Sequence, residues 1–251
     1  MSNAIVFYDI PSSLRPHQAW SPNTWRTRFS LNYKGLPYKT VWVEYPDIGK
    51  VSKEIGAAPT STKADGRPHY TLPAIHDPST GTSLSDGLAI AEYLDSQYPD
   101  TPKLIPDGTA ALQAAFSHVH RGSLGDIWNF VLPATNKFLN PRSEEYFRHT
   151  REQSFGKRLE DVVPVGEVRE KEWGKIKAGF ETFDGFLLKS EGEFVMGNTI
   201  SWADITIVSF LIWFKRVFGE TSQEWKDISS WNEGRWAKRL DAFQKYQSEE
   251  N

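Results

Sequence analysis

The sequence predicts an α/β domain followed by an all-helical domain. Two patterns support this prediction: short apolar runs alternate with helical periodicity as far as residue 98, and only helical periodicity follows Pro106. Between the two parts lies a proline-punctuated stretch with Pro99 and Pro102. We therefore expect an N-terminal domain over residues 1–100 and a C-terminal domain over residues 108–251, both of ordinary size.

The first part has the order strand, helix, strand, then strand, strand, helix. Trp25, Phe29 and Tyr33 lie at i, i+4 and i+8, which predicts a helix that Gly35 ends. The strands are short runs rich in β-branched and aromatic residues. Strands are expected over residues 4–8, 38–45, 72–76 and 83–84, and helices over residues 23–34 and 88–98, with an exposed polar loop over residues 60–69. This order is the thioredoxin-like arrangement.

The second part shows only helical stripes. Trp173, Ile176, Phe180, Phe183 and Leu187 recur at spacings of three and four, which predicts one strongly amphipathic helix. Further helices are expected over residues 112–131 (ended or kinked by Pro133), 144–163, 205–218 and 236–243. The run 205–218 is apolar nearly all round, as expected of a central buried helix.

Composition excludes several classes of function. Lys and Arg total 29 against 32 Asp and Glu, which argues against a nucleic-acid or membrane-surface partner. No apolar run is long enough to cross a bilayer, and no signal peptide is visible, so we expect a cytoplasmic protein. The absence of Cys excludes disulfides, thiolate metal sites and a Cys nucleophile. His118 and His120 are two apart on a helix and do not face each other, so no metal site is expected.

Four local motifs remain. The segment 20–25 contains Ser21 followed by Pro22, which is typical of a helix start. The pair at 72–73 places Pro at the start of a strand, and the segment 85–87 is a helix N-terminus suited to an anion. Each of these three also has an ordinary capping or strand-edge explanation. The fourth, Ser201 to Asp204, is a capping box that we expect to serve folding.

In this order and at these separations, the four motifs resemble those of the cytosolic glutathione transferases over nearly the whole chain. The segment 8–11, the loop around Trp20, the long loop to Tyr70 and the Trp-rich tail are most similar to the fungal-specific A class. That class is found in wood-decaying fungi and is related to bacterial β-aryl etherases.

The resemblance implies a glutathione site. Ser21 would donate its hydroxyl to the glutathione sulfur, and Leu72, before a cis Pro73, would pair its backbone with the cysteinyl unit. Asp86 and the N–H of Gly87 would hold the γ-glutamyl end. The family usually has Ser after the acid, so we expect the hydroxyl missing at Gly87 to weaken glutathione binding.

Other residues are assigned by the same resemblance. Asn23 would lie beside glutathione, and Lys53, Arg67 and His69 are the candidates for its glycyl carboxylate.

The role implied for Ser21 is energetically reasonable. Lowering a thiol pKa from about 8.5 to about 6.5 needs roughly 2.7 kcal/mol. One hydrogen bond to a charged group supplies about 1.5–3 kcal/mol, and a helix N-terminus adds about 0.3–1 kcal/mol.

Ten Trp and fifteen Phe suggest an aromatic acceptor site. Trp20, Trp25, Phe116 and His120 are its candidates, with core packing as the alternative, above all for Trp25. We expect glutathione conjugation of aromatic electrophiles, or cleavage of aryl ethers or esters, in detoxification of phenolic wood-derived compounds. A ligandin that binds aromatic compounds with little turnover is the alternative. The resemblance also implies a homodimer and no metal.

Overall fold

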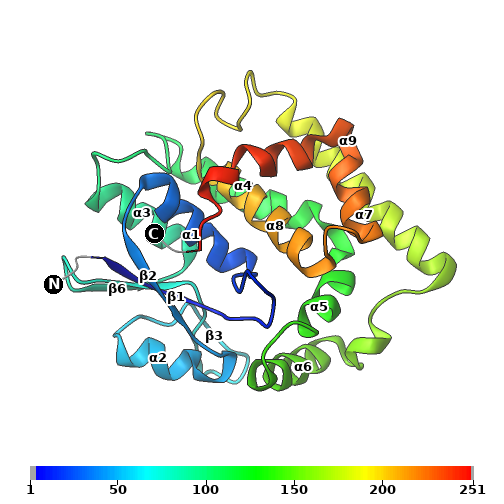
Figure 1. Cartoon of the computed structure of the whole chain (residues 1–251), viewed down its shortest axis with the longest axis horizontal. Coiled ribbons are helices and arrows are strands. Elements are labelled where there is room, and N and C mark those ends of the chain that lie inside the picture. The colour runs from blue at the N-terminus through cyan, green and yellow to red at the C-terminus, as the bar shows by residue number, and fades with distance from the viewer. Residues whose placement is uncertain (1–3, 250–251) are drawn as a thin grey trace.

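Four strands form a mixed sheet in the N-terminal domain of the computed structural model, which describes residues 4–249 (Figure 1). They are β1 (Ile5–Asp9), β2 (Tyr38–Trp42), β5 (Ala74–Asp77) and β6 (Thr82–Ser85), in the order β2-β1-β5-β6. β1 is parallel to β2 and antiparallel to β5, and β5 and β6 form a hairpin. The parallel pair needs a crossover, which the first helix supplies.

Three helices accompany the sheet: α1 (Pro22–Lys34), α2 (Ile48–Glu54) and α3 (Gly87–Gln97), with a 3-10 turn η1 (Tyr45–Asp47) before α2. α1 begins after Ser21 with Pro22 in its first turn and ends at Gly35, whose φ of 66° is left-handed, as the sequence predicts. α1 packs beside α3, and α2 lies apart from them (Figure 1). The thioredoxin-like arrangement is thus confirmed.

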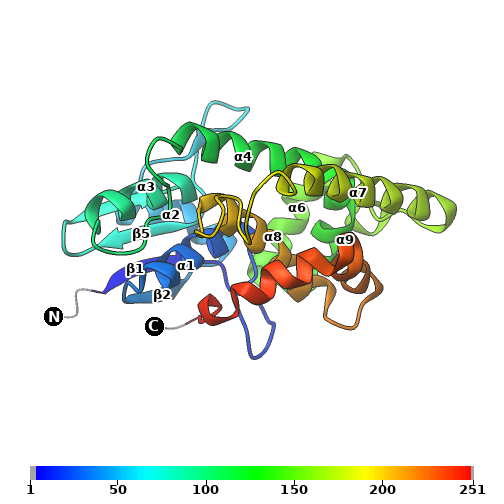
Figure 2. The ribbon, with the colours of Figure 1, turned by 90° about the horizontal axis from the view of Figure 1, so that it is seen from above.

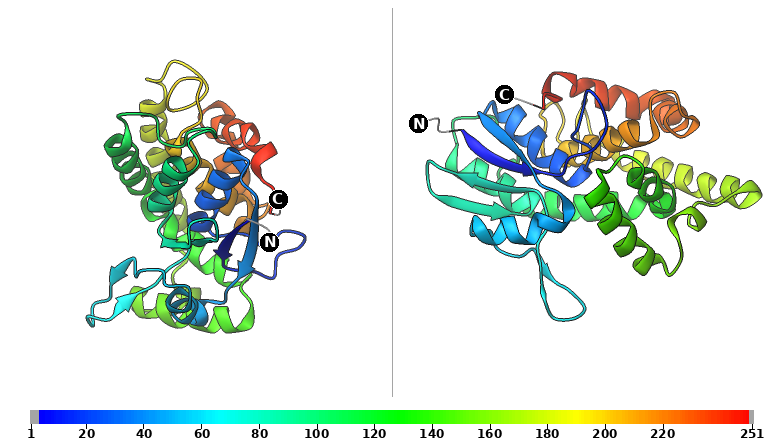
Figure 3. Two further views of the ribbon diagram at one scale, coloured as in Figure 1. Left: turned by 90° about the vertical axis from the view of Figure 1, so that its left-hand side faces the viewer. Right: turned by 60° about the horizontal axis from the view of Figure 1, so that its bottom comes forward.

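The exposed loop expected over residues 60–69 contains a small hairpin instead. Its strands β3 (Ser61–Thr62) and β4 (Pro68–His69) are two residues each, too short to produce an alternating pattern. The hairpin projects from the body of the domain (Figure 3).

The C-terminal domain is built of helices, and two isolated β-bridges lie in the loop over residues 194–199 (Figure 2). Its helices are α4 (Ala110–Ser123), α5 (Trp128–Asn136), α6 (Pro141–Phe155), α7 (Gly166–Leu187), α8 (Trp202–Phe218) and α9 (Gln223–Ala242), with 3-10 turns η2 (Gly125–Ile127), η3 (Leu159–Asp161) and η4 (Gln244–Tyr246). The predicted stripe of α7 faces the core, with Trp173 half-buried at its edge. None of the helices in residues 4–249 is long and apolar enough to cross a bilayer.

Three helix boundaries differ from the prediction. The helix expected over residues 112–131 is divided at Gly125, whose φ of 54° is left-handed, and Pro133 lies inside α5. The helix expected to reach residue 163 ends at Gly156, which has a φ of 68°. α9 begins well before residue 236 and is interrupted over residues 231–234, where three consecutive residues have positive φ.

The central helix α8 is buried along nearly all of its length. Its first turn carries the predicted capping box: Asp204 Oδ2 accepts from Ser201 N at 3.0 Å and from Ser201 Oγ at 2.9 Å. Asp204 Oδ1 also accepts from Val195 N at 2.9 Å. α8 packs along α1, so the core is continuous across the two domains.

Candidate active site

The sheet brings two of the predicted glutathione loops to one edge. In the register, Tyr8 lies opposite Ala74, and Ala74 lies opposite Ser85. The residues just before β5 and just after β6 are therefore neighbours, and Asp86 N donates to Pro73 O at 3.3 Å. The peptide bond between residues 72 and 73 is cis, as the resemblance implied.

Asp86 caps α3 in an unusual backbone conformation. Its φ is 81°, a region that L residues rarely adopt, and its carboxylate accepts from Leu88 N at 3.0 Å and Ala89 N at 3.1 Å. The side chain is exposed, while Gly87 is buried. The start of α3 thus places the N–H of Gly87 beside one carboxylate that an ammonium group can approach.

Gly87 lies against a residue of the other domain. A Cβ placed on Gly87 would lie 3.2 Å from Cη2 of Trp202, at the start of α8. The indole of Trp202 is fixed by its Nε1 donating to Ser117 Oγ at 3.0 Å. A side chain at position 87 would therefore crowd the ring of Trp202, which no local pattern reveals.

Arg26 on α1 is a residue that sequence reasoning missed. Its Cβ and Cδ lie 3.8 and 3.9 Å from a Cβ placed on Gly87, and its Nε is buried without an acceptor. Burial and the charge of Arg121 lower the pKa of Arg26 to about 10, while the carboxylate of Asp86 opposes that shift. No ion pair with Arg26 occurs in residues 4–249, so an unneutralised cation lies beside the α3 N-terminus. The sequence gives only a weak indication of Arg26, which is a charged residue between the aromatic positions of a buried helix.

Ser21 is the N-cap residue of α1 and is 3% exposed. Its carbonyl oxygen accepts from Trp25 N at 2.9 Å and from Thr24 Oγ1 at 3.1 Å. The side-chain cap that a serine at this position usually forms is not made. Within the described chain the Ser21 hydroxyl has no hydrogen-bond partner, so it is free to donate to a ligand.

Ser21 lines a cleft of about 300 Å³ between the two domains. Asn23 lines it too, and Arg121, Leu132, Arg151 and Ser154 contribute from α4, α5 and α6. Its aromatic residues are Trp20, Tyr45, Trp128, Phe210 and Trp213. Burial raises the pKa of Tyr45 to about 12, although the Arg151 guanidinium lowers it.

Of the four residues expected at the acceptor site, only Trp20 lines this cleft. Trp25 is fully buried; its ring is 4.7 Å from that of Phe29 and 4.6 Å from Cζ of Arg216. It belongs to the buried core, where α1 packs against α8.

Phe116 and His120 were also expected at the acceptor site, but both pack inward from α4 against Phe183 of α7, with ring centroids 5.4 and 5.0 Å away. Burial lowers the pKa of His120 to about 3, with a further contribution from Arg26. Successive side chains turn by about 100° on a helix, so the residue after His120, Arg121, reaches the cleft instead.

The three candidates for the glycyl carboxylate are in different situations. Arg67 is bound to Asp65 at the tip of the exposed hairpin, with Nε 2.8 Å from Oδ2. The ammonium of Lys53, at the end of α2, lies 5.6 Å from the ring centroid of Tyr70. His69 Nδ1 lies 3.2 Å from Ser61 Oγ, and partial burial lowers its pKa. Lys53 and His69 remain available to an anion.

Comparisons with known proteins agree with this geometry. The description "Glutathione S-transferase, N-terminal domain" matches residues 20–97, and "Glutathione S-transferase, C-terminal domain" matches residues 111–246. The chain belongs to the glutathione S-transferase family.

Fungal members of that family are similar over nearly the whole length. A glutathione S-transferase of Ceriporiopsis subvermispora, solved in complex with glutathione, is 54% identical, with a TM-score of 0.93 and 98% of both chains covered. GSTFuA3 from Phanerochaete chrysosporium is 46% identical, with a TM-score of 0.91 and 98% of both chains covered. The glutathione S-transferase-like protein ustS of Aspergillus flavus is 36% identical over 89% of this chain and 85% of its own.

In this transferase chain the C-terminal segment reaches back to the loop that precedes Ser21 (Figures 1 and 2). The carboxylate of Glu249 accepts from Gln18 N at 3.1 Å and from Ala19 N at 3.2 Å. Arg216 of α8 binds both Glu249 Oε1, at 2.7 Å, and the carbonyl oxygen of Ala19. We call Glu249 and Arg216 the C-terminal clamp, because together they hold the backbone just before Trp20 and Ser21.

In residues 4–249, no three His, Asp or Glu side chains lie close enough together to hold a metal ion. The polar groups of the transferase cleft are instead hydroxyl, amide and guanidinium groups.

Proposed function

We propose that this chain is a serine-type glutathione transferase that acts on aromatic acceptors. The observation that carries the proposal is Ser21 at the N-terminus of α1, which lines an aromatic cleft and whose hydroxyl has no hydrogen-bond partner in residues 4–249. Donation of this hydroxyl to the glutathione sulfur favours the thiolate over the thiol, because a hydrogen bond to a charged group is worth about 1.5–3 kcal/mol. The thiolate then attacks an electrophilic carbon of the acceptor.

Glutathione would lie along the sheet edge. Leu72, before the cis bond to Pro73, would pair its backbone with the cysteinyl unit. Asp86 would bind the γ-glutamyl ammonium, while Arg26 and the N–H of Gly87 would bind the adjacent carboxylate.

The other end of glutathione would extend toward α2. Lys53 and His69 are the groups we assign to the glycyl carboxylate, and Asn23 would contact glutathione from the cleft wall. Glutathione-bound relatives support the cosubstrate.

The acceptor chemistry follows the fungal-specific A class resemblance. We assign this chain to the etherase-related transferases, which conjugate aromatic electrophiles or cleave aryl ethers and esters with glutathione as nucleophile. Detoxification of phenolic wood-derived compounds, in the cytoplasm and as a homodimer, is the corresponding physiological role.

Replacement of Ser21 tests this function. Ser21→Ala should lower kcat/KM with an activated aromatic chloride by about 10- to 150-fold, the kinetic equivalent of roughly 1.5–3 kcal/mol. The pKa of bound glutathione, read from thiolate absorbance, should rise. Ser154→Ala is the matched control, because Ser154 lines the same cleft but its hydroxyl donates to Thr150 O at 2.9 Å. Equal activity of the two variants would refute the role of Ser21.

A ligandin remains the second candidate, and one observation favours it. A separate cavity of about 570 Å³ lies in the helical domain, with Phe130, Phe138, Leu159 and Phe218 in its wall. Calorimetry with a hydroxylated flavonoid distinguishes the two functions. A transferase alone should bind one molecule, in competition with the acceptor. A ligandin should bind without competition, and Leu159→Arg should abolish that binding.

A further inference from the structure

The charges of the Ser21 cleft are unbalanced. Its lining includes Arg121 of α4 and Arg151 of α6 but no Asp or Glu. Neither arginine forms an ion pair with a carboxylate of residues 4–249. The whole chain has a net charge of -3, so this concentration of positive charge is a local feature.

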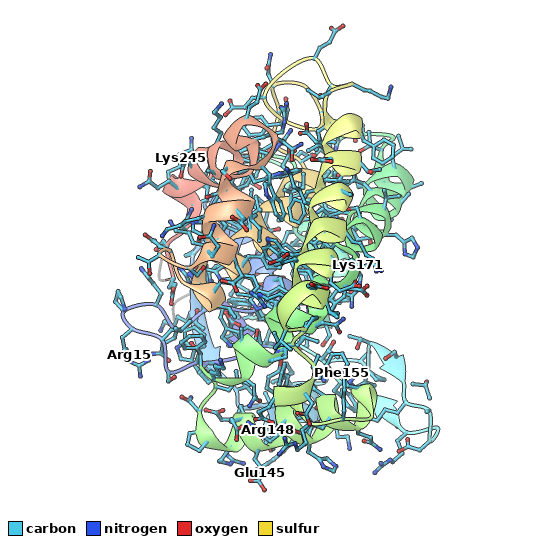
Figure 4. All side chains as sticks on the ribbon, turned by 90° about the vertical axis from the view of Figure 1, so that its right-hand side faces the viewer. Arg15, Glu145, Arg148, Phe155, Lys171 and Lys245 are labelled. Atoms are coloured by element: carbon cyan, nitrogen blue, oxygen red, sulfur yellow. The ribbon has the colours of Figure 1, made fainter. Side chains whose placement is uncertain are left out.

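The other arginines of α6 differ from Arg151. Arg142 binds Asp47 with Nη1 2.8 Å from Oδ2, and Arg148 binds Glu144 with Nε 2.8 Å from Oε1. Figure 4 shows this end of the molecule, with Glu145 extending outward from α6 and Arg148 nearer the body. Arg151 instead places its Cζ 4.4 Å from the ring centroid of Phe147 and makes only a 3.3 Å contact to Thr150 Oγ1.

Arg121 approaches from the other side. Its Cζ lies 4.8 Å from the ring centroid of Trp128, which also lines the cleft. A guanidinium stacked on an aromatic ring keeps its N–H edge free for an anion. Deeper in the protein, Arg26 lies 5.4 Å from the ring centroid of Phe210, another lining residue, so its charge acts on the cleft as well.

We propose that the preferred acceptor of this cleft is an aromatic carboxylate. Its ring would lie among Trp20, Trp128 and Trp213, and its carboxylate would be bound by Arg121 and Arg151. Arginine is suited to this because its planar fork of donors matches a carboxylate and remains charged at every working pH. The inference rests on the proposed function, because it names the acceptor class of that same site.

The test compares 4-chloro-3-nitrobenzoate with 4-chloro-3-nitrobenzamide, which has nearly the same shape and no charge. In both reactions the thiolate sulfur bonds to the ring carbon that bears chlorine, and chloride leaves with the electron pair of the broken C–Cl bond. Each kcat/KM is divided by the uncatalysed rate constant with glutathione, which removes the difference in intrinsic reactivity. The native enzyme should then favour the benzoate by about tenfold or more, as expected for hydrogen bonds to a charged group.

Arg121→Met and Arg151→Met keep an unbranched apolar stem similar to that of arginine and remove the charged guanidinium. Each should lower the preference for the benzoate toward unity, because kcat/KM falls more for the benzoate than for the benzamide, while the KM for glutathione stays the same. Arg142→Met is the matched control on α6, because Arg142 is already paired with Asp47. An equal loss with both acceptors and a higher KM for glutathione would assign that arginine to glutathione and overturn the inference.

A binding measurement separates failure of this inference from failure of the proposed function. If neither compound is turned over, the transferase function fails, and affinity is measured by quenching of tryptophan fluorescence without glutathione. Tighter binding of the benzoate, lost in the two arginine variants, would still support an anionic aromatic ligand. Equal affinity for benzoate and benzamide would overturn it.

Discussion

The space available at Gly87 is limited by Trp202, a residue far away in the sequence. The serine that the family usually has would place its Cβ 3.2 Å from the ring of Trp202, tighter than an ordinary van der Waals contact. The departure from the family pattern is therefore coupled to a tryptophan of the second domain.

We predict that Gly87→Ser alone will not tighten glutathione binding, because the crowding offsets the gained hydroxyl. Combined with Trp202→Phe, which shortens the ring, it should bind glutathione more tightly than Trp202→Phe alone. Calorimetry on the four members of this double-mutant cycle measures the coupling. Additive effects of the two substitutions would contradict the steric explanation.

His120 makes the stability of the helical domain depend on pH. Because burial lowers its pKa to about 3, the folded chain takes up this proton far below the pH at which the unfolded chain does, near 6.5. The contribution of His120 to stability is therefore complete above pH 6.5 and is lost as the pH falls. His120→Gln should reduce the slope of unfolding free energy against pH between 6 and 4, by up to about 1.4 kcal/mol per pH unit. Urea unfolding at several pH values measures this; parallel curves would contradict it.

At the scale of elements, the C-terminal clamp ties Glu249 to the loop that precedes Ser21. Glu249 accepts two backbone N–H groups of the loop, and both lie within three residues of Ser21. The loop otherwise has no regular structure over residues 10–21. Its shape thus depends on a residue more than two hundred positions away.

We predict that Glu249→Ala will speed hydrogen exchange at the amides of Gln18 and Ala19 by about tenfold or more, since each loses a hydrogen bond to a charged group. The catalytic rate should fall with the loosening of Ser21. Glu220→Ala is the control, because Glu220 pairs with Lys215 at the surface and does not contact the loop. Unchanged exchange in Glu249→Ala would show that the clamp does not order the loop.

Helices were predictable where apolar residues repeat on one face, as in α7, or where a run is apolar nearly all round, as in α8. The thioredoxin-like order followed from short apolar runs. The interruptions of the helices were not predictable, because the apolar periodicity does not change at Gly125 or over residues 231–234. The cleft was half predictable: Ser21 and Trp20 belong to a local motif. Arg121 and Arg151 reach it through packing of α4 and α6, which no local pattern reports. Helix rotation places Arg121, rather than His120, at the cleft.

At the scale of the whole molecule, α4 leaves apolar side chains uncovered. Leu112 is 68% exposed and Val119, seven residues later on the same face, is 45% exposed. Exposed apolar groups on one helix face are typical of an interface, and in a two-fold dimer each substitution acts twice.

We predict that the native protein is a dimer in light scattering and that the double variant Leu112→Glu with Val119→Glu is a monomer. Val168→Glu, at a 59% exposed position of α7, should remain dimeric. A native protein that is already monomeric would contradict the predicted dimer, and a double variant that stays dimeric would place the interface elsewhere.

Three of the ten tryptophans, Trp20, Trp128 and Trp213, line a single cleft of about 300 Å³. The fluorescence of these tryptophans can therefore report ligand binding in the cleft. An acceptor that absorbs in the near ultraviolet will receive excitation from these indoles by resonance energy transfer, whereas glutathione, which has no such absorption, will not. Binding of an aromatic acceptor can thus be titrated in the native chain, with or without glutathione, and without dye or label.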